Sequence, residues 1–291
     1  MSPLSLGTQT LLALLAFAGN SVLCRLALND NLIDANSFTL VRLISGAVVL
    51  IGLLLLTQPA GRIFERPNNS RFKQAAYLFI YAACFSIAYL MLGTAAGALI
   101  LFVSVQLTML LVQYIQGRRS TALEIIGLTL ALGSFAAWMI PGAQRPDISG
   151  ILLMAIAGVA WGFYTINGKS SDNPQQDTAM NFLYSVGFCV LLLPLYWFNE
   201  PLNVTQQGLL LAIASGAITS GLGYWLWYRV LPAFTSLSAG VMQLSVPVLA
   251  SIGGMIWNHE AITLTFVLAS SGILGGIFLV LFSGYLLSKS S

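Results

Sequence analysis

Charged residues are scarce in this chain: only 7% of its 291 residues are Asp, Glu, Lys or Arg, against roughly 25% in soluble domains. Histidine occurs once, as His259, and one histidine cannot build a metal site alone. The three cysteines, Cys24, Cys84 and Cys189, lie inside apolar stretches, so no disulfide framework is expected. Neither HExxH nor GxSxG occurs, and no Gly-rich phosphate-binding motif ends in Gly-Lys. The common soluble-enzyme chemistries therefore lack their residues, and neither a metal nor another cofactor is predicted.

Apolar residues, by contrast, make up 57% of the sequence and gather in ten long stretches. A helix needs about 20 apolar residues to cross the roughly 30 Å hydrocarbon core of a bilayer. The expected helices cover residues 7–27, 36–57, 73–92, 95–115, 121–140, 149–168, 177–197, 206–229, 234–256 and 262–286. The segments between them are short and rich in turn-forming residues, so no extramembrane domain fits there. The sequence predicts an all-α membrane protein with ten transmembrane helices.

Basic residues are distributed unevenly between the two sets of alternating loops. Lys and Arg near helix ends favour the cytoplasm, and the sequence predicts that both termini lie there, in a bacterial-type inner membrane. The cytoplasmic set is then Arg62, Arg66, Arg71, Lys73, Arg118, Arg119, Lys169, Arg229 and Lys289. Only Arg25 and Arg145 fall outside. The first stretch is expected to be a retained helix, because residues 1–10 carry no Lys or Arg as a signal peptide would. No basic run resembles a nucleic-acid-binding surface, so no nucleic-acid partner is expected.

An internal repeat emerges when the sequence is aligned with itself at an offset of 141 to 144 residues. Residues 16–20 then match residues 160–164, and residues 104–107 match residues 245–248. Each half contains five expected helices. Because five is odd, the second half enters the membrane in the opposite orientation, which makes the repeat inverted. Inverted repeats are a recurring plan of secondary transporters, although a membrane enzyme can also be duplicated.

The second half carries Ala-Trp-Gly at residues 160–162 and a basic residue, Lys169, at the end of the same helix. Pro247 follows in the ninth expected helix, and Glu260 lies before the tenth. At these residues the chain resembles the EamA-type family of the drug/metabolite transporter superfamily. Each five-helix half of that family opens with an Ala-x-Trp-Gly-like stretch that ends in a basic residue.

The first half departs from the family pattern, with Phe17 and Ala18 in place of Trp and Gly, but it keeps Arg25 at the expected spacing. The resemblance implies two EamA-like five-helix repeats, at residues 1–143 and 144–291. It also implies transport of small metabolites, with export as the favoured direction. It says little about the substrate, because this branch includes exporters of amino acids and of many other metabolites.

Among the polar residues inside expected helices, Arg42 is the strongest candidate for contact with a substrate. It lies about six residues, or roughly 9 Å, into its helix, where a charge costs up to about 2.5 to 3.5 kcal/mol. The functional interpretation is a cation that attracts a carboxylate or another anion near the outer mouth. The structural alternative is a side chain that snorkels outward or pairs with Asp30 or Asp34. For Arg25, at the outer end of the first helix, the structural role is favoured.

Aromatic residues lie on one face of the first helix of each half, and in the first half an amide shares that face. Phe17 and Asn20 lie on one face of the first helix, and Trp161 and Tyr164 lie on the equivalent face of the sixth. Aromatic walls with an amide suit a small amphipathic or aromatic solute. Ordinary packing between helices is the alternative for each of these residues.

Both halves also place a glutamine on a symmetry-related face, as Gln106 and Gln243. A central cavity explains this, whereas the alternative is a hydrogen bond between helices worth about 0.6 kcal/mol. Tyr81, Tyr89 and Tyr224 are expected deep in the membrane and are further candidates for the site. An interfacial aromatic belt is expected from Tyr77, Trp225, Trp227, Tyr228 and Tyr285.

These features favour a secondary transporter that exports small organic metabolites such as amino acids by alternating access. Few titratable groups lie within the expected helices, so a facilitator or exchanger is favoured over a proton-driven carrier. The alternative from another class is a membrane-embedded enzyme acting on a lipid-linked substrate, which requires intramembrane carboxylates or histidines that the sequence lacks. The expected partners are a small-molecule substrate and the lipid bilayer, with the chain acting as a monomer or homodimer.

Overall fold

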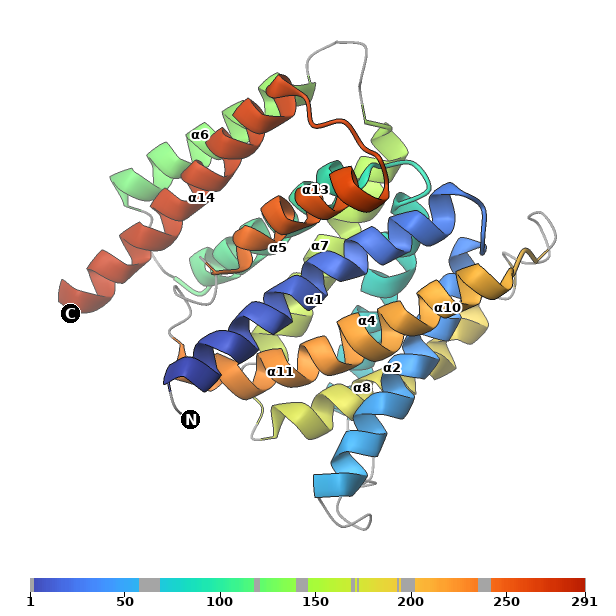
Figure 1. Cartoon of the computed structure of the whole chain (residues 1–291). Helices are drawn as coiled ribbons and strands as arrows, with labels where there is room; N and C mark the ends of the chain where they lie inside the picture. Colours follow the sequence, from blue (N-terminus) through green and yellow to red (C-terminus); the bar gives the residue numbers. More distant parts are fainter. Residues whose placement is uncertain are drawn as a thin grey trace.

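The apolar stretches fold into helices that lie side by side (Figure 1). The structure, a computed structural model, describes residues 3–57, 69–117, 121–139, 146–168, 171, 173–192, 194, 202–234 and 242–290. The first half contains α1 (Pro3–Asn29), α2 (Ala35–Thr57), α4 (Asn69–Ala88), α5 (Thr94–Ile115) and α6 (Ala122–Met139). The second half contains α7 (Ile148–Gly168), α8 (Pro174–Phe188), η1 (Cys189–Leu192), α10 (Gln206–Ala214), η2 (Ser215–Leu222), α11 (Gly223–Val230), η3 (Leu231–Ala233), α13 (Ser245–Trp257) and α14 (Leu264–Ser290).

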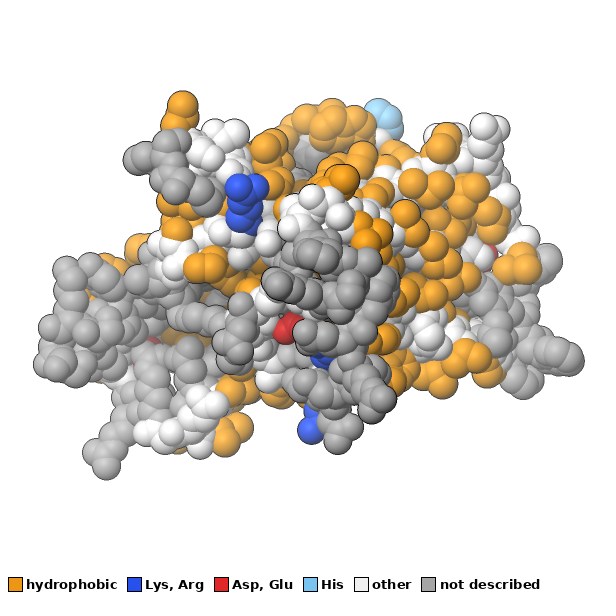
Figure 2. Space-filling model, turned by 90° about the horizontal axis from the view of Figure 1, so that it is seen from below, with side chains coloured by type: hydrophobic (Ala, Val, Ile, Leu, Met, Phe, Trp, Pro, Cys, Tyr) orange, Lys and Arg blue, Asp and Glu red, His pale blue; other side chains and the backbone are white. Residues whose placement is uncertain are grey.

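In the part of the chain that the structure describes, five helical segments are long and apolar enough to cross a bilayer. These are Leu4–Asn29, Ala35–Thr57, Thr94–Val112, Ile148–Gly168 and Gln206–Ala233, and shorter apolar helices cover Ala122–Ser134, Ser245–Trp257 and Leu264–Val280. On the face that Figure 2 shows, hydrophobic side chains cover broad areas and charged side chains are few. Large apolar side chains such as Ile115 and Leu264 are 80% and 73% exposed, as expected of surfaces that face lipid.

The helices pack as a bundle with one helix pair at its side (Figure 1). In the bundle, α4 packs on α7 and α8, α5 packs on α7 and α13, and α2 packs on α8 and η2. Helix α1 packs on α13, η2 and α11. The side pair consists of α6 and α14, whose backbones meet at Gly127 and Gly276. A Cβ added at either glycine would lie within 2.5 Å of the other's carbonyl oxygen, so small residues permit this close crossing.

Within the span that begins at Gln206, the segment η2 is a π-helix rather than an α-helix. Gly216 lies where η2 meets α2: a Cβ there would lie 1.9 Å from Ser45 Oγ and 2.2 Å from the Arg42 carbonyl oxygen. Only glycine permits so close an approach of the two backbones. π segments inside α-helical spans are frequent at functional sites, and η2 contains the hydroxyl residues of the polar cluster described below.

The expected helix boundaries hold closely in most spans, with three informative differences. The helix expected at 73–92 ends at Ala88, because residues 89–92 form a turn. The helix expected at 177–197 begins earlier, at Pro174, where the Asn173 side chain accepts a hydrogen bond from the Gln176 N–H. In the ninth span a turn at Leu244 precedes α13, three residues before Pro247, which cannot donate a backbone hydrogen bond.

The expected aromatic belt is wrong for two of its members. Trp227 and Tyr228 are 2% and 4% exposed and belong to the core. The Trp227 ring lies 5.6 Å from the Phe17 ring, so these side chains face the bundle instead of the membrane surface. The Tyr285 side chain lies outside the described part of the structure, as do the loop residues Arg62, Arg66, Arg118, Arg119, Arg145 and Lys169 on which the orientation prediction depends.

Candidate functional site

A small cavity of about 20 Å³ lies between helices of the bundle. Helices α1, α4, α5, α7 and α11 contribute its walls. Its lining residues are Phe17, Asn20, Ser21, Tyr81, Phe85, Leu101, Phe102, Trp161 and Tyr224. A space of this size holds about one water molecule, so the chain is in a conformation too closed to contain a metabolite.

Arg42 lies beside this cavity and is 1% exposed. Its Nε donates to Ser220 Oγ at 3.1 Å, and its Nη2 donates to the Tyr81 hydroxyl at 3.0 Å. The guanidinium carbon stands 5.1 Å and 5.0 Å from the ring centres of Tyr81 and Phe85, which is within the range of cation–π attraction. The remaining nitrogen, Nη1, is buried without a hydrogen-bond partner.

The carboxylates expected as partners of Arg42 do not fill that role in the structure. Asp34 accepts hydrogen bonds from the backbone N–H groups of Asn36 and Ser37 at 3.1 and 2.9 Å, at the start of α2. Asp30 accepts from the Asn29 side chain and is exposed. The structural alternative in which Arg42 pairs with Asp30 or Asp34 is therefore wrong, because both carboxylates stay at the helix ends while Arg42 turns into the bundle.

Asn20 connects the first half of the chain to η2. Its Nδ2 donates to the Tyr81 hydroxyl at 3.2 Å. Its Oδ1 accepts from Ser215 Oγ at 2.7 Å and lies 3.4 Å from Thr219 Oγ1. The Tyr81 oxygen thus accepts hydrogen bonds from both Arg42 and Asn20. One connected polar cluster, comprising Asn20, Arg42, Tyr81, Ser215, Thr219 and Ser220 and called the central cluster below, joins α1, α2, α4 and η2.

Aromatic rings surround the central cluster. The Trp161 ring lies 4.9 Å from both the Tyr81 and Tyr224 rings, and it stacks on Tyr164 at 5.2 Å. Phe17 meets Tyr224 edge to face at 5.7 Å. Such contacts pack the closed cavity tightly. Trp161 and Tyr224 line the cavity, whereas Tyr164 lies in the layer behind Trp161.

Three more expected site residues are buried and, like Tyr164, do not line the cavity in this conformation. Tyr89 is fully buried near the end of α4, where its hydroxyl donates to the Thr94 carbonyl at 3.4 Å. Gln106 and Gln243 are 1% and 3% exposed. The Gln106 Nε2 has no hydrogen-bond partner. A role for these residues in substrate binding stays a prediction.

The structure adds residues that the sequence did not single out. Ser215, Thr219 and Ser220 supply the hydroxyl groups of the central cluster. Their spacing of four and five residues in an apolar span was the available signal. Hydroxyl side chains usually satisfy themselves within their own helix, as Thr219 does in part by donating to the Ser215 carbonyl at 2.7 Å, so this signal is weak.

Ion pairs hold the helix ends together on both sides of the cavity. At the end of α4 and start of α5, the Glu260 carboxylate accepts from Thr94 N at 2.7 Å and from Thr94 Oγ1 at 2.9 Å. Arg25 Nε lies 3.6 Å from Glu260, and Arg25 Nη1 donates to the Tyr89 carbonyl. Arg25, Glu260 and Thr94 are called the Glu260 cluster below. The pairing of Arg25 with Glu260 agrees with the structural role expected for Arg25.

The second ion pair lies near the beginning of α4. Arg71 Nε lies 3.2 Å from Asp177 Oδ1, and the Ser171 hydroxyl donates to Asp177 Oδ2 at 2.6 Å. These three residues, called the Asp177 cluster below, join α4 to the start of α8. Along α4, the 17 positions from Arg71 to Ala88 correspond to about 26 Å, and Tyr89, whose carbonyl Arg25 contacts, follows Ala88 directly. The two clusters therefore lie at opposite ends of the bundle.

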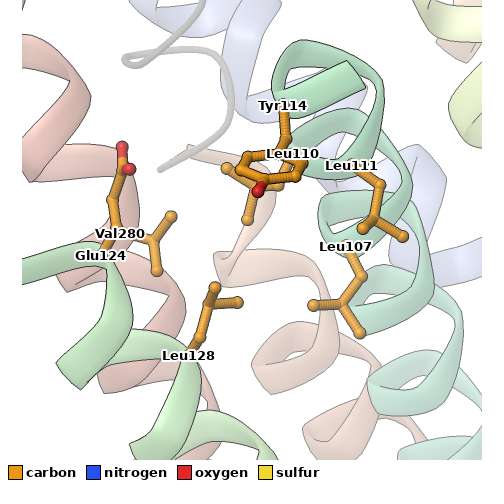
Figure 3. Close-up of a pocket in the computed structure, with 7 residues that line it drawn as sticks. All are labelled: Leu107, Leu110, Leu111, Tyr114, Glu124, Leu128 and Val280. Atoms are coloured by element: carbon orange, nitrogen blue, oxygen red, sulfur yellow. The ribbon is translucent and has the colours of Figure 1, made fainter. Parts of the chain in front are cut away.

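A larger pocket of about 250 Å³ lies between α5 and the α6–α14 pair (Figure 3). Leucines from α5 and α6 and Val280 from α14 form most of its wall (Figure 3). The carboxylate of Glu124 accepts from the Thr121 N–H at 3.0 Å in a capping arrangement at the start of α6. This pocket is more apolar than the central cavity, and the polar groups that could orient a solute converge at the central cluster instead.

Among the described residues, no group of three His, Cys, Asp or Glu side chains is placed to hold a metal ion. The chemistry that the site offers is therefore hydrogen bonding, one positive charge and aromatic surface.

Comparison with known proteins agrees with this architecture. The model of the EamA-like transporter family matches residues 148–282. The uncharacterized protein PA1977 of Pseudomonas aeruginosa is 45% identical over 273 residues, which cover 94% of this chain and 93% of that protein. The uncharacterized transporter YoaV of Bacillus subtilis is 26% identical over 162 residues, which cover 53% of this chain and 56% of YoaV.

A crystal structure of a protein shares the fold, with a TM-score of 0.67 and 18% identity over 98% of this chain and 99% of that one. Apolar helices long enough to cross a bilayer, a family match in the second half and a relative that spans nearly the whole chain lead to the same conclusion. The chain belongs to the EamA-like transporter family, as a multi-pass membrane transporter.

Proposed function

We propose that this chain is a secondary transporter that exports small organic metabolites such as amino acids by alternating access. The observation that carries the proposal is the central cluster, in which a fully buried arginine and an amide meet inside an apolar, lipid-exposed bundle. Ionisable groups at membrane depth are costly and commonly mark a substrate pathway. We place the protein in a cell inner membrane with both termini in the cytoplasm, from the distribution of Lys and Arg.

We further propose that residues 1–143 and 144–291 form two inverted repeats. The packing of the helices supports this, because exchanging each helix for its counterpart in the other half reproduces the observed neighbours. The contact of α5 with α7 becomes that of α13 with α1, and the contact of α4 with α8 becomes that of η2 with α2. The helices α2 and α8 are counterparts and contact each other, as do α6 and α14, so the exchange leaves these two contacts unchanged. A binding site at the interface of such repeats is the usual arrangement.

The closed cavity supports alternating access. Its volume of about 20 Å³ is too small for a metabolite, and the Glu260 and Asp177 clusters join helices at the two ends of the bundle. In this proposal the structure represents an occluded state. Breaking the Glu260 cluster opens one end, and breaking the Asp177 cluster opens the other.

The proposal is tested with the purified chain in liposomes loaded with a panel of amino acids and related metabolites. Time-dependent exit of at least one compound from protein-containing liposomes, but not from empty ones, is the expected result. If no compound of a broad panel moves, the transport of small metabolites is refuted. Efflux from intact cells that overproduce the chain, compared with uptake, then tests the direction, and reporter fusions at both termini test the orientation.

A further inference from the structure

The central cluster contains one positive charge and no negative one. Arg42 donates to two neutral hydroxyl groups, those of Ser220 and Tyr81, and its Nη1 has no partner. The rings of Tyr81 and Phe85 attract the cation but carry no net charge. Among the described residues, the ion pairs observed involve Arg25 and Arg71, not Arg42.

A buried charge of this kind requires compensation. Removing a guanidinium from water without a counter-charge is strongly unfavourable, and a buried N–H group without an acceptor adds to that cost. Only 1% of the Arg42 surface is exposed, so the side chain does not reach solvent in this conformation. An anion that enters the cavity would supply both the missing charge and the missing acceptor.

We propose that Arg42 is the receptor for a carboxylate group of the transported solute, so that the substrates are carboxylates with an apolar or aromatic body. This inference rests on the proposed transport function and names its substrate class. The donor is Arg42 Nη1, and the hydrogen bonds that Nε and Nη2 of the same guanidinium donate to Ser220 and Tyr81 fix its orientation.

The charge and the walls of the site set the chemistry of the ligand. A single guanidinium balances one carboxylate group, whereas a dianionic phosphate group would retain uncompensated charge. The planar fork of arginine also matches the geometry of a carboxylate. Phe17, Trp161 and Tyr224 line the same cavity, and their faces suit the apolar body of the solute once the cavity opens.

The test compares matched pairs of probes that differ only at the carboxylate. Phenylalanine, leucine and phenylacetate are compared with phenylalaninamide, leucinamide and phenylacetamide, and inorganic phosphate serves as a different anion. Ligand-induced thermal stabilisation of the purified full-length chain reports binding, because a ligand of the folded state raises its apparent stability. Inhibition of transport in liposomes provides the second measurement.

We expect at least one carboxylate to bind about tenfold or more tightly than its amide, as for a hydrogen bond to a charged group. Arg42→Gln should lower the affinity for that carboxylate about tenfold or more. It should change the affinity for the matching amide less than about threefold. Arg42→Lys should retain part of the preference. Lys73→Gln, which removes an exposed charge in the second turn of α4, should keep the wild-type preference.

Equal binding of carboxylates and amides overturns the inference, as does tighter binding of phosphate or an unchanged preference in a folded Arg42→Gln variant. If that variant does not fold, the probe pairs on the wild-type chain decide alone. Transport without carboxylate preference refutes this inference and leaves the transport proposal standing. Carboxylate binding without transport of any compound supports this inference and refutes the transport proposal. A panel in which nothing binds and nothing moves refutes both.

Discussion

Replacing Glu260 with glutamine should open the end of the bundle at which α1 terminates. The carboxylate accepts from Thr94 N and Oγ1 at 2.7 and 2.9 Å and pairs with Arg25 at 3.6 Å. Gly93, which precedes α5, provides no side-chain cap, so Glu260 caps this helix from another part of the chain.

The expected effect follows from the loss of charge. A hydrogen bond to a charged group contributes about 1.5 to 3 kcal/mol and a neutral one about 0.5 to 1.5, while a partly exposed ion pair adds at most about 1. Glutamine keeps one acceptor oxygen, so the closed state should lose about 2 kcal/mol relative to a state in which the Glu260 cluster is already broken. That difference corresponds to a shift of about 30-fold in the ratio of open to closed molecules.

The assay measures access to the cavity. Ser21 lines the cavity and is 1% exposed, so Ser21→Cys in a chain whose native cysteines are replaced by alanine reports opening. We expect Glu260→Gln to raise the labelling rate by a membrane-impermeant thiol reagent about tenfold or more, from the side on which α1 ends. Asp30→Asn, which removes an exposed carboxylate at the same end, should leave the rate unchanged. Equal labelling rates for Glu260→Gln and the parent would refute the reasoning.

Three further changes test other parts of the structure. Gly216→Ala should lower the free energy of unfolding by about 1 to 3 kcal/mol, because the added Cβ would lie 1.9 Å from Ser45 Oγ. Gly52→Ala, whose added Cβ would have nothing within 4 Å, should have little effect. Equal denaturation midpoints for the two variants would contradict this. Asp177→Asn should raise labelling of the cavity cysteine from the opposite side of the membrane, and a rise on the Glu260 side instead would count against the proposed second gate. Gln106→Leu should leave unfolding nearly unchanged, because its buried Nε2 lacks a partner, yet reduce transport; transport at the wild-type rate would remove this residue from the site.

Several features of the site were accessible from the sequence because they depend on local pattern. Helical spacing placed Asn20 on the same face as Phe17, and both line the cavity. Arg42 stood out because a charge within an apolar stretch is costly wherever the helix packs. The same reasoning failed for Trp227, since an aromatic residue near a helix end suits either the membrane surface or the core, and only packing distinguishes the two.

The sequence by itself determined the helices and the membrane class, because the length and hydropathy of a span are properties of consecutive residues. It also marked the residues whose burial is costly. Tertiary structure alone decided the partners of Arg42, since Ser220 lies 178 residues further along the chain and reaches it only where η2 packs on α2. It likewise turned Glu260 into the cap of α5. Such contacts depend on which helix faces meet, and that choice depends on small residues such as Gly216, whose importance no local pattern reveals.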